Sequence, residues 1–221
     1  MVRSGEVLAA CRCRPAGARG FREGLMLRPP TAGDRRASVV AIAETMPAYP
    51  AEPPYHPSEA YPERLFGDVG DASPANGAYA AVRQLFRLLG FDASRYGTPA
   101  WNPLGCVIRP GDRVLVKPNL VLHLNHLGHD LTSVVTHAAV LRPILDFVLI
   151  ALDGQGSVVV GDAPLQSCDF DQVVARSGVG PLVQFYRSRG FPVELRDFRL
   201  VTSRDGLYPE PRRASAGDQA G

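Results

Sequence analysis

The sequence predicts an α/β fold with a mostly parallel sheet, crossover helices and an incomplete C-terminal part. Short apolar runs alternate along the chain with segments of helical periodicity, as in successive βαβ units. Glycines separate many of these segments, and the sequence contains no internal repeat. The 221 residues allow one α/β domain with a substantial core, and 45% hydrophobic with 21% charged residues is ordinary for a globular protein.

Three regions are expected along the chain. Residues 1–36 contain eight arginines and three acidic residues and show no hydrophobic periodicity, so they are predicted to form a disordered leader. Residues 37–202 are predicted to form the α/β domain, including an extended arm rich in proline and tyrosine at 47–74 that lies over the surface. Residues 203–221, mostly small and polar, are predicted to form a disordered tail.

The first part of the domain contains two predicted strands and one predicted helix. Residues 38–44 (SVVAIAE) form an apolar run that favours a strand. Residues 76–89 repeat apolar side chains at i, i+3 and i+4 and end at a glycine, which predicts an amphipathic helix. Residues 112–117 (DRVLVK) follow a Pro-Gly turn and predict a second strand.

The second part of the domain continues the alternation of helix and strand. Thr136 is the expected N-cap of the first helix, and the run SVVVG reads as a short buried strand. The predicted elements are a helix at 136–152, a strand at 157–161, helices at 169–177 and 181–188, and an edge strand at 193–200. Arg196 and Arg199 in the last strand are expected to be solvated.

Composition and motifs exclude several classes of function. The leader has a net charge of +5, so the rest of the chain carries −3 and lacks the basic face that nucleic-acid binding requires. No Cys-x-x-Cys pair, Walker motif or dinucleotide fingerprint occurs, so no iron–sulfur cluster or bound nucleotide is expected and the cofactor stays unknown. No segment reads as a secretory signal or membrane span, which predicts a cytoplasmic protein without membrane insertion.

Lys117 is the only lysine among the 24 lysine and arginine residues of the chain. A lysine is a compact point charge that can act as a base or an amine nucleophile, whereas arginine can do neither. Lys117 is the last residue of a predicted strand, at the end where parallel sheets bind their ligands. Two interpretations follow: the site requires an ammonium group, or a single lysine occurs here by chance in an arginine-rich sequence.

Lys117 and Asp162 end two strands that a single crossover helix connects, which favours their being parallel neighbours. The carboxyl ends of parallel strands meet at one sheet edge, toward which helix N-termini also point. Polar side chains that meet at this edge suit the binding of an anionic ligand and proton transfer to or from it. The alternative is that Lys117 and Asp162 form a structural ion pair while Asn119 and Thr136 cap turns. The candidate catalytic residues are Lys117, Asp162 and His137, and the candidate ligand-binding residues are Asn119, Thr136 and Pro164.

A histidine-rich segment is a second candidate site. His123, His126 and His129 are spaced by three residues, and neutral imidazoles are common metal ligands, to which Asp130 adds an oxygen. On a loop, however, this spacing fixes no common face, so a solvated histidine-rich loop is the alternative.

Three motifs together resemble the family known as domain of unknown function 362. They are VLVKPNLV at 114–121, Thr136-His137, and VVVGDAP at 158–164. The resemblance extends from about residue 37 to residue 221. It includes YPAEPP at 49–54 and WNPLG at 101–105, which are similar to a subgroup associated with capsular and exopolysaccharide biosynthesis.

The resemblance implies a cytoplasmic α/β protein of unsettled biochemical role. Some relatives carry an iron–sulfur module, whose cysteines this chain lacks. Relatives of the polysaccharide type are longer, which implies a chain truncated at its C-terminus.

These observations favour binding or transformation of an anionic small molecule, either a sugar phosphate or a carboxylated sugar in surface-polysaccharide biosynthesis. One alternative is a metal-binding or redox accessory protein that uses the loop at 123–129. Another is a non-catalytic pathway scaffold that uses the arm, or an inactive fragment. Whether the protein is an enzyme stays open, and no protein partner is indicated.

Overall fold

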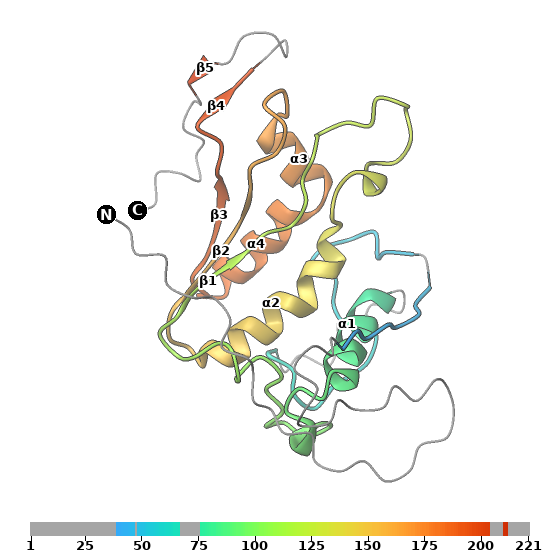
Figure 1. The fold of residues 1–221 in the computed structure, drawn as a ribbon, viewed down its shortest axis with the longest axis vertical. Helices are drawn as coiled ribbons and strands as arrows, with labels where there is room; N and C mark the ends of the chain where they lie inside the picture. The colour runs from blue at the N-terminus through green and yellow to red at the C-terminus, as the bar shows by residue number, and fades with distance from the viewer. Residues whose placement is uncertain (1–38, 47, 67–75, 204–209, 212–221) are drawn as a thin grey trace.

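A computed structural model describes residues 39–46, 48–66, 76–203 and 210–211 of the chain. At its centre lies a three-stranded parallel sheet in the order β1-β2-β3, which confirms the predicted α/β fold (Figure 1). The strands are β1 at Arg113–Val116, β2 at Ser157–Asp162 and β3 at Val193–Asp197. The predicted leader at 1–36 and most of the predicted tail at 203–221 lie outside the described residues.

Helices connect the strands and lie on one side of the sheet (Figure 1). The α-helices of the described residues are α1 at Gly77–Leu88, α2 at Ala138–Leu152, α3 at Phe170–Arg176 and α4 at Val179–Ser188. Helix α2 connects β1 to β2, and α3 with α4 connects β2 to β3. Both connections step across the sheet in the same direction, so right-handed crossovers place them on the same face.

Shorter elements complete the described part of the chain. The 3-10 turns are η2 at Ala93–Arg95 and η3 at Leu131–Ser133. Beyond the sheet, β4 at Val201–Thr202 pairs antiparallel with β5 at Glu210–Pro211. Within the described residues, no helix combines the length and apolar character that crossing a membrane requires.

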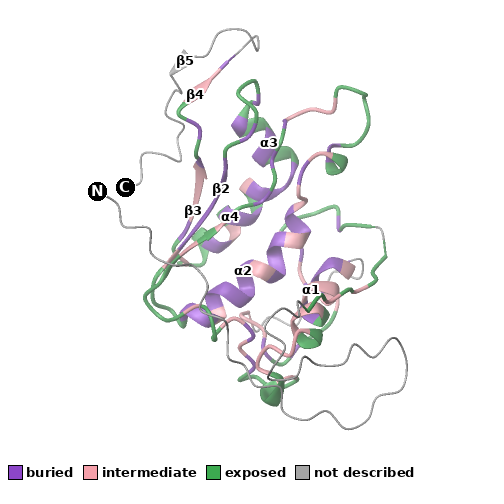
Figure 2. Cartoon of the chain, viewed as in Figure 1, coloured by how far each residue is buried: buried purple, intermediate pink, exposed green. Residues whose placement is uncertain are grey.

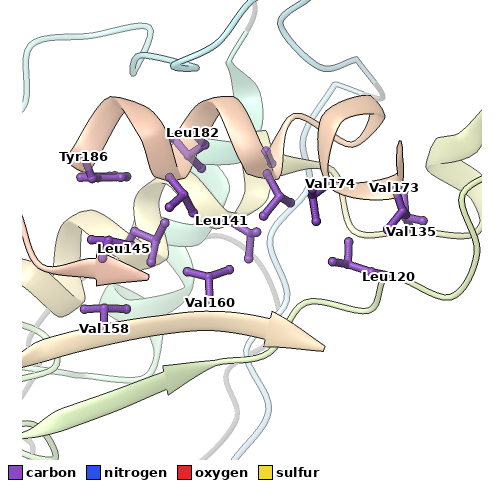
Figure 3. Close-up of a cluster of buried hydrophobic side chains, with 14 of the residues drawn as sticks. Leu120, Val135, Leu141, Leu145, Val158, Val160, Val173, Val174, Leu182 and Tyr186 are labelled. Carbon is purple, nitrogen blue, oxygen red and sulfur yellow. The ribbon is translucent and has the colours of Figure 1, made fainter. Parts of the chain in front are cut away.

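The main core lies between the sheet and the helices (Figure 3). Val158 and Val160 of β2 point toward the helices and are fully buried. Leu145 of α2 and Leu182 of α4 pack into the same cluster. Because β2 is the central strand, nearly all of its residues are buried, whereas β1 and β3 are more exposed (Figure 2). The continuous apolar run that predicted this strand is therefore explained by its central place.

The helix boundaries follow the sequence closely, with one correction at the start of α2. The N-cap is His137, whose Nδ1 accepts a hydrogen bond from Ala139 N at 3.1 Å. The predicted cap, Thr136, instead accepts from Asn119 N through its hydroxyl oxygen at 3.1 Å. Thr136 is engaged by the loop that precedes the helix, and the next polar side chain takes its place.

Two strand predictions are corrected by the structure. Residues 39–44, the described part of the expected first strand at 38–44, form no strand, and Val39, Val40 and Ile42 are exposed. An apolar run becomes a strand only where a neighbouring strand pairs with it, and no strand of the described residues pairs with this run. The predicted edge strand at 193–200 ends at Asp197, because its side chain accepts from Arg199 N at 3.0 Å and turns the backbone.

The arm is more deeply embedded than the prediction of a surface segment implies. In its described part, Tyr55, Tyr61 and Glu63 are buried. Asn76, the N-cap of α1, donates to Tyr55 O at 2.6 Å, and Arg142 of α2 donates to Pro54 O at 2.8 Å. These contacts make the arm part of the domain's packing.

Candidate functional site

Lys117 and Asp162 lie together at the carboxyl edge of the sheet. Strands β1 and β2 are parallel neighbours with Val116 paired to Val160, so both chains leave the sheet at the same edge. The ammonium nitrogen of Lys117 lies 2.7 Å from Asp162 Oδ1. The expectation that these two residues meet therefore follows directly from the strand order, and we call this edge the rim site, comprising Lys117, Asn119, Thr136 and Asp162.

Asp162 is buried and held in one orientation. Its side chain is only 6% exposed. Its Oδ2 accepts from Leu120 N at 2.7 Å, and its Oδ1 accepts from Ala163 N at 2.8 Å. With the Lys117 ammonium as third donor, both carboxylate oxygens are engaged. Asp162 therefore fixes the positions of the two loops that leave β1 and β2.

Lys117 is the accessible member of the pair, with 55% of its side chain exposed. Besides Asp162, its ammonium donates to Asn119 Oδ1 at 3.2 Å. An ammonium has three N–H donors, so these two contacts leave one N–H for a ligand or water. The charge is thus held at a fixed place while part of it faces outward.

A short antiparallel contact links Lys117 to the start of α2. Thr136 N donates to Asn119 O at 2.8 Å, and Asn119 N donates to Thr136 Oγ1 at 3.1 Å. The next residues, Leu120 and Val135, form an isolated antiparallel bridge. The loop between β1 and α2 therefore returns to the sheet edge, which brings Asn119 and Thr136 together beside Lys117 as expected.

His137 lies next to this group but is committed to the helix and to the arm. Its ring stacks on Tyr49, with centroids 4.4 Å apart, and meets Tyr55 edge-on at 5.2 Å. Burial lowers the pKa of His137, and Asp130 acts weakly in the opposite direction. Because Nδ1 accepts from Ala139 N, the neutral ring carries its proton on Nε2. His137 is thereby suited to donate a hydrogen bond and not to act as a base.

Pro164 has a packing position in the structure. It is buried, and it follows Asp162 by two residues in the loop that leaves β2. Leu165 N, immediately after it, donates to Val121 O at 3.1 Å and joins the loops after β1 and β2. A proline side chain has no hydrogen-bonding group, so Pro164 shapes the loop and offers a ligand only apolar contact.

The structure does not bring His123, His126 and His129 together. His123 Nδ1 accepts from Asp169 N at 3.0 Å, which ties it to the start of α3. His126 and His129 are exposed on the loop. Within the described residues, no group of three histidine, cysteine or acidic side chains is placed to hold a metal ion.

Arg199 is a supporting residue that the sequence analysis missed. The prediction of a solvated side chain is wrong, because Arg199 is 8% exposed and its Nη2 lies 2.7 Å from Asp197 Oδ2. Its Nη1 donates to the carbonyl oxygens of Leu165 and Cys168 at 2.8 and 2.7 Å. No local pattern marks this role, since the bonded residues are more than 30 positions apart in the chain.

The comparison with protein families agrees with the motifs around this site. Residues 114–207 match a family model described as Domain of unknown function (DUF362). The matched segment is thus similar to that family, and it contains β1 from Val114 onward, the rim site and β3. No curated protein and no solved structure matches the chain.

Proposed function

We propose that the rim site binds an anionic small molecule, with the Lys117 ammonium as its anchor. The observation that carries this proposal is the division of roles within the ion pair. Asp162 is buried and committed to backbone donors, whereas Lys117 is half exposed and retains one N–H. A positive charge held rigidly at the carboxyl edge of a parallel sheet favours an anionic group there.

Two further donors support the same ligand class. The Thr136 hydroxyl accepts from Asn119 N, which leaves its own O–H free to donate. The Asn119 side chain is exposed and turns its oxygen toward Lys117, so its amide nitrogen is the end left to meet a ligand. An ammonium, an amide and a hydroxyl together match the acceptor oxygens of a phosphate or a carboxylate.

The ligand class that we propose is a sugar phosphate or a carboxylated sugar, used in surface-polysaccharide biosynthesis. This part of the proposal derives from the resemblance of the YPAEPP and WNPLG segments to relatives of that type. Asp162 serves to position Lys117, because both of its oxygens already accept hydrogen bonds. The geometry thus supports binding more directly than proton abstraction by Asp162.

The other two hypotheses have less support. A metal site would require His123, His126 and His129 to converge, and their positions on the loop give no such group. A scaffold that presents the arm to a partner would require exposed aromatic residues. Tyr55 and Tyr61 are buried, and Tyr49, although 45% exposed, stacks on His137.

Calorimetric titration with inorganic phosphate tests the proposal. We expect Lys117→Met to weaken phosphate binding about tenfold to a hundredfold, since a hydrogen bond to a charged group contributes about 1.5–3 kcal/mol. Arg113→Met is the matched control. It removes a charge of the same sign at the start of β1, from a side chain that is 63% exposed.

The control variant is expected to bind phosphate like the wild-type protein. The melting temperature of Arg113→Met should change little, because exposed ion pairs contribute only about 0–1 kcal/mol. Equal phosphate affinity in Lys117→Met and the wild type would refute the assignment.

A further inference from the structure

We infer that the anion bound at the rim site carries an apolar chain, so that the ligand is an amphiphilic anion of the lipid-phosphate class. This inference rests on the proposed function, because the Lys117 ammonium anchors the anionic group. It derives from four exposed apolar residues beside the rim site, which we call the apolar border. They are Val121, Leu165, Phe198 and Leu200, exposed by 42%, 54%, 40% and 88%.

Backbone hydrogen bonds place the apolar border next to the ion pair. Phe198 N donates to the carbonyl oxygen of Asp162 at 2.8 Å. Val121 follows Leu120, whose N–H donates to the Asp162 carboxylate at 2.7 Å. Leu165 N donates to Val121 O at 3.1 Å. The border therefore comes from three separate segments that all meet at Asp162.

The ring of Phe198 lies on the same part of the sheet edge as Lys117. A Cβ atom added to Gly161 would come within 2.7 Å of Phe198 Cε2, so the ring covers this glycine. Val160 pairs with Val116, which places the next residues, Gly161 and Lys117, opposite each other. The absence of a side chain at Gly161 lets an aromatic ring approach the strand at the residue before Asp162.

The apolar border is held on a rigid backbone. Arg199 is buried, paired with Asp197, and donates to the carbonyl oxygens of Leu165 and Cys168. Its two neighbours in sequence, Phe198 and Leu200, belong to the border. Ser203 N also donates to Gln166 O at 2.9 Å, which fixes the end of β4 beside the same loop. These side chains are thus exposed on an ordered surface.

An apolar chain attached to the anion explains why the cation and the exposed apolar side chains occur together. A single exposed leucine needs no explanation, but apolar residues grouped around a charge indicate a ligand with both characters. Each methylene that such a ligand buries should tighten binding about fourfold. The cation at the centre selects an anionic amphiphile over a cationic one.

Titrations with inorganic phosphate, dodecyl phosphate and dodecyltrimethylammonium, each detergent below its critical micelle concentration, test this inference. We expect the wild-type protein to bind dodecyl phosphate at least about tenfold more tightly than inorganic phosphate. The double variant Leu165→Ser, Leu200→Ser should lose most of this preference. Leu127→Ser is the matched control, since Leu127 is 80% exposed on the histidine-rich loop, and should keep it.

The outcomes separate this inference from the proposed function. If inorganic phosphate binds through Lys117 but dodecyl phosphate binds no more tightly, the amphiphilic ligand is refuted and the anion site stands. If neither anion binds, the proposed function fails. Equal binding of dodecyltrimethylammonium, or an equal loss in Leu127→Ser, would show general detergent adsorption and would also refute the inference.

Discussion

Lys117 and Asp162 form an ion pair in which the two partners have different surroundings. Asp162 receives two backbone N–H donors and the ammonium, all at 2.7–2.8 Å, in a buried position. A buried carboxylate that is fully hydrogen-bonded keeps its place. Lys117 reaches this carboxylate from the solvent side, so the pair presents its positive end outward. A lysine suits this place because its compact ammonium can approach two acceptors and still face a ligand.

His137 shows how a residue chosen from the sequence for its chemistry can have a structural role. Its Nδ1 caps α2, and its ring packs between Tyr49 and Tyr55. Protonation of Nδ1 would remove the acceptor that the Ala139 N–H needs. Burial of the ring also disfavours its charged form and lowers the pKa of His137.

The stability of the protein should therefore depend on the charge of His137. Because the pKa of His137 is lower in the folded state than in the unfolded chain, the unfolded state binds more protons in acid. The contribution of neutral His137 to the free energy of unfolding is fully present above the unfolded pKa of about 6.5, and it is lost as the pH falls through the folded pKa. Urea unfolding at pH 7.5 and 5.5 measures the loss in the free energy of unfolding between these two pH values. We expect His137→Asn, which keeps a capping side chain without a titrating ring, to reduce it.

Exposed His126 provides the control for this experiment. The variant His126→Gln should retain the pH dependence of the wild-type protein. An unchanged pH dependence in His137→Asn would contradict the prediction.

The junction between α3 and α4 depends on the arm. Gly178, the N-cap of α4, has a φ of +79°, in the left-handed region that glycine adopts without strain. A Cβ atom there would overlap the hydroxyl of Tyr55, which is 3% exposed. Ala138 N donates to Ser177 O at 3.0 Å, so the same turn also contacts the start of α2. The turn thus needs glycine both for its backbone angle and for the space that Tyr55 occupies.

These two effects can be separated with a second glycine. Gly190 has a φ of +80° and open space where its Cβ would lie. Gly190→Ala should cost about 1–2 kcal/mol for the left-handed angle alone. Gly178→Ala should cost about 1–3 kcal/mol more, because the buried Tyr55 cannot move aside. Chemical denaturation measures both values, and Tyr55→Phe should recover part of the additional loss. Equal losses in the two alanine variants would contradict the role of Tyr55.

Local sequence patterns predicted those elements whose causes are local. The alternation of apolar and helical segments predicted a mostly parallel sheet in which the strands before Lys117 and Asp162 are neighbours, and this order was enough to bring the two residues together. The predictions that were wrong depended on distant partners. Residues 39–44 have the composition of a strand, but no strand of the described residues pairs with them. Arg199 is buried because carbonyl groups on the loop after β2 accept from it, which no pattern in its own segment reveals.

At the scale of the whole molecule, buried arginines connect elements that are far apart in the sequence. Arg83 of α1 pairs with Glu63 of the arm, and Arg199 pairs with Asp197 and fixes the loop after β2. Arg142 of α2 pairs with Asp146 one turn later, with both side chains no more than 3% exposed. Such pairs are costly to desolvate and are stable only when further hydrogen bonds satisfy them.

The Arg142–Asp146 pair meets this requirement through the surrounding elements. Tyr79 of α1 and Tyr186 of α4 donate to Asp146 at 2.9 and 2.6 Å, and Arg142 donates to Pro54 O in the arm. Burial and the nearby carboxylate raise the pKa of both tyrosines well above their usual value, so both stay protonated donors. One ion pair thereby joins α1, α2, α4 and the arm.

Removal of Arg142 should therefore destabilise the whole molecule. We expect Arg142→Met to lower the free energy of unfolding by about 3–5 kcal/mol, because it leaves the Asp146 carboxylate buried without its countercharge. Arg113→Met is the control: Arg113 lies 3.9 Å from Glu194 at the exposed side of the sheet, and its loss should cost no more than about 1 kcal/mol. Urea denaturation of the three proteins gives both differences. A loss below about 1 kcal/mol in Arg142→Met would mean that the tyrosines alone satisfy Asp146, and that this network does not hold the arm and the helices together.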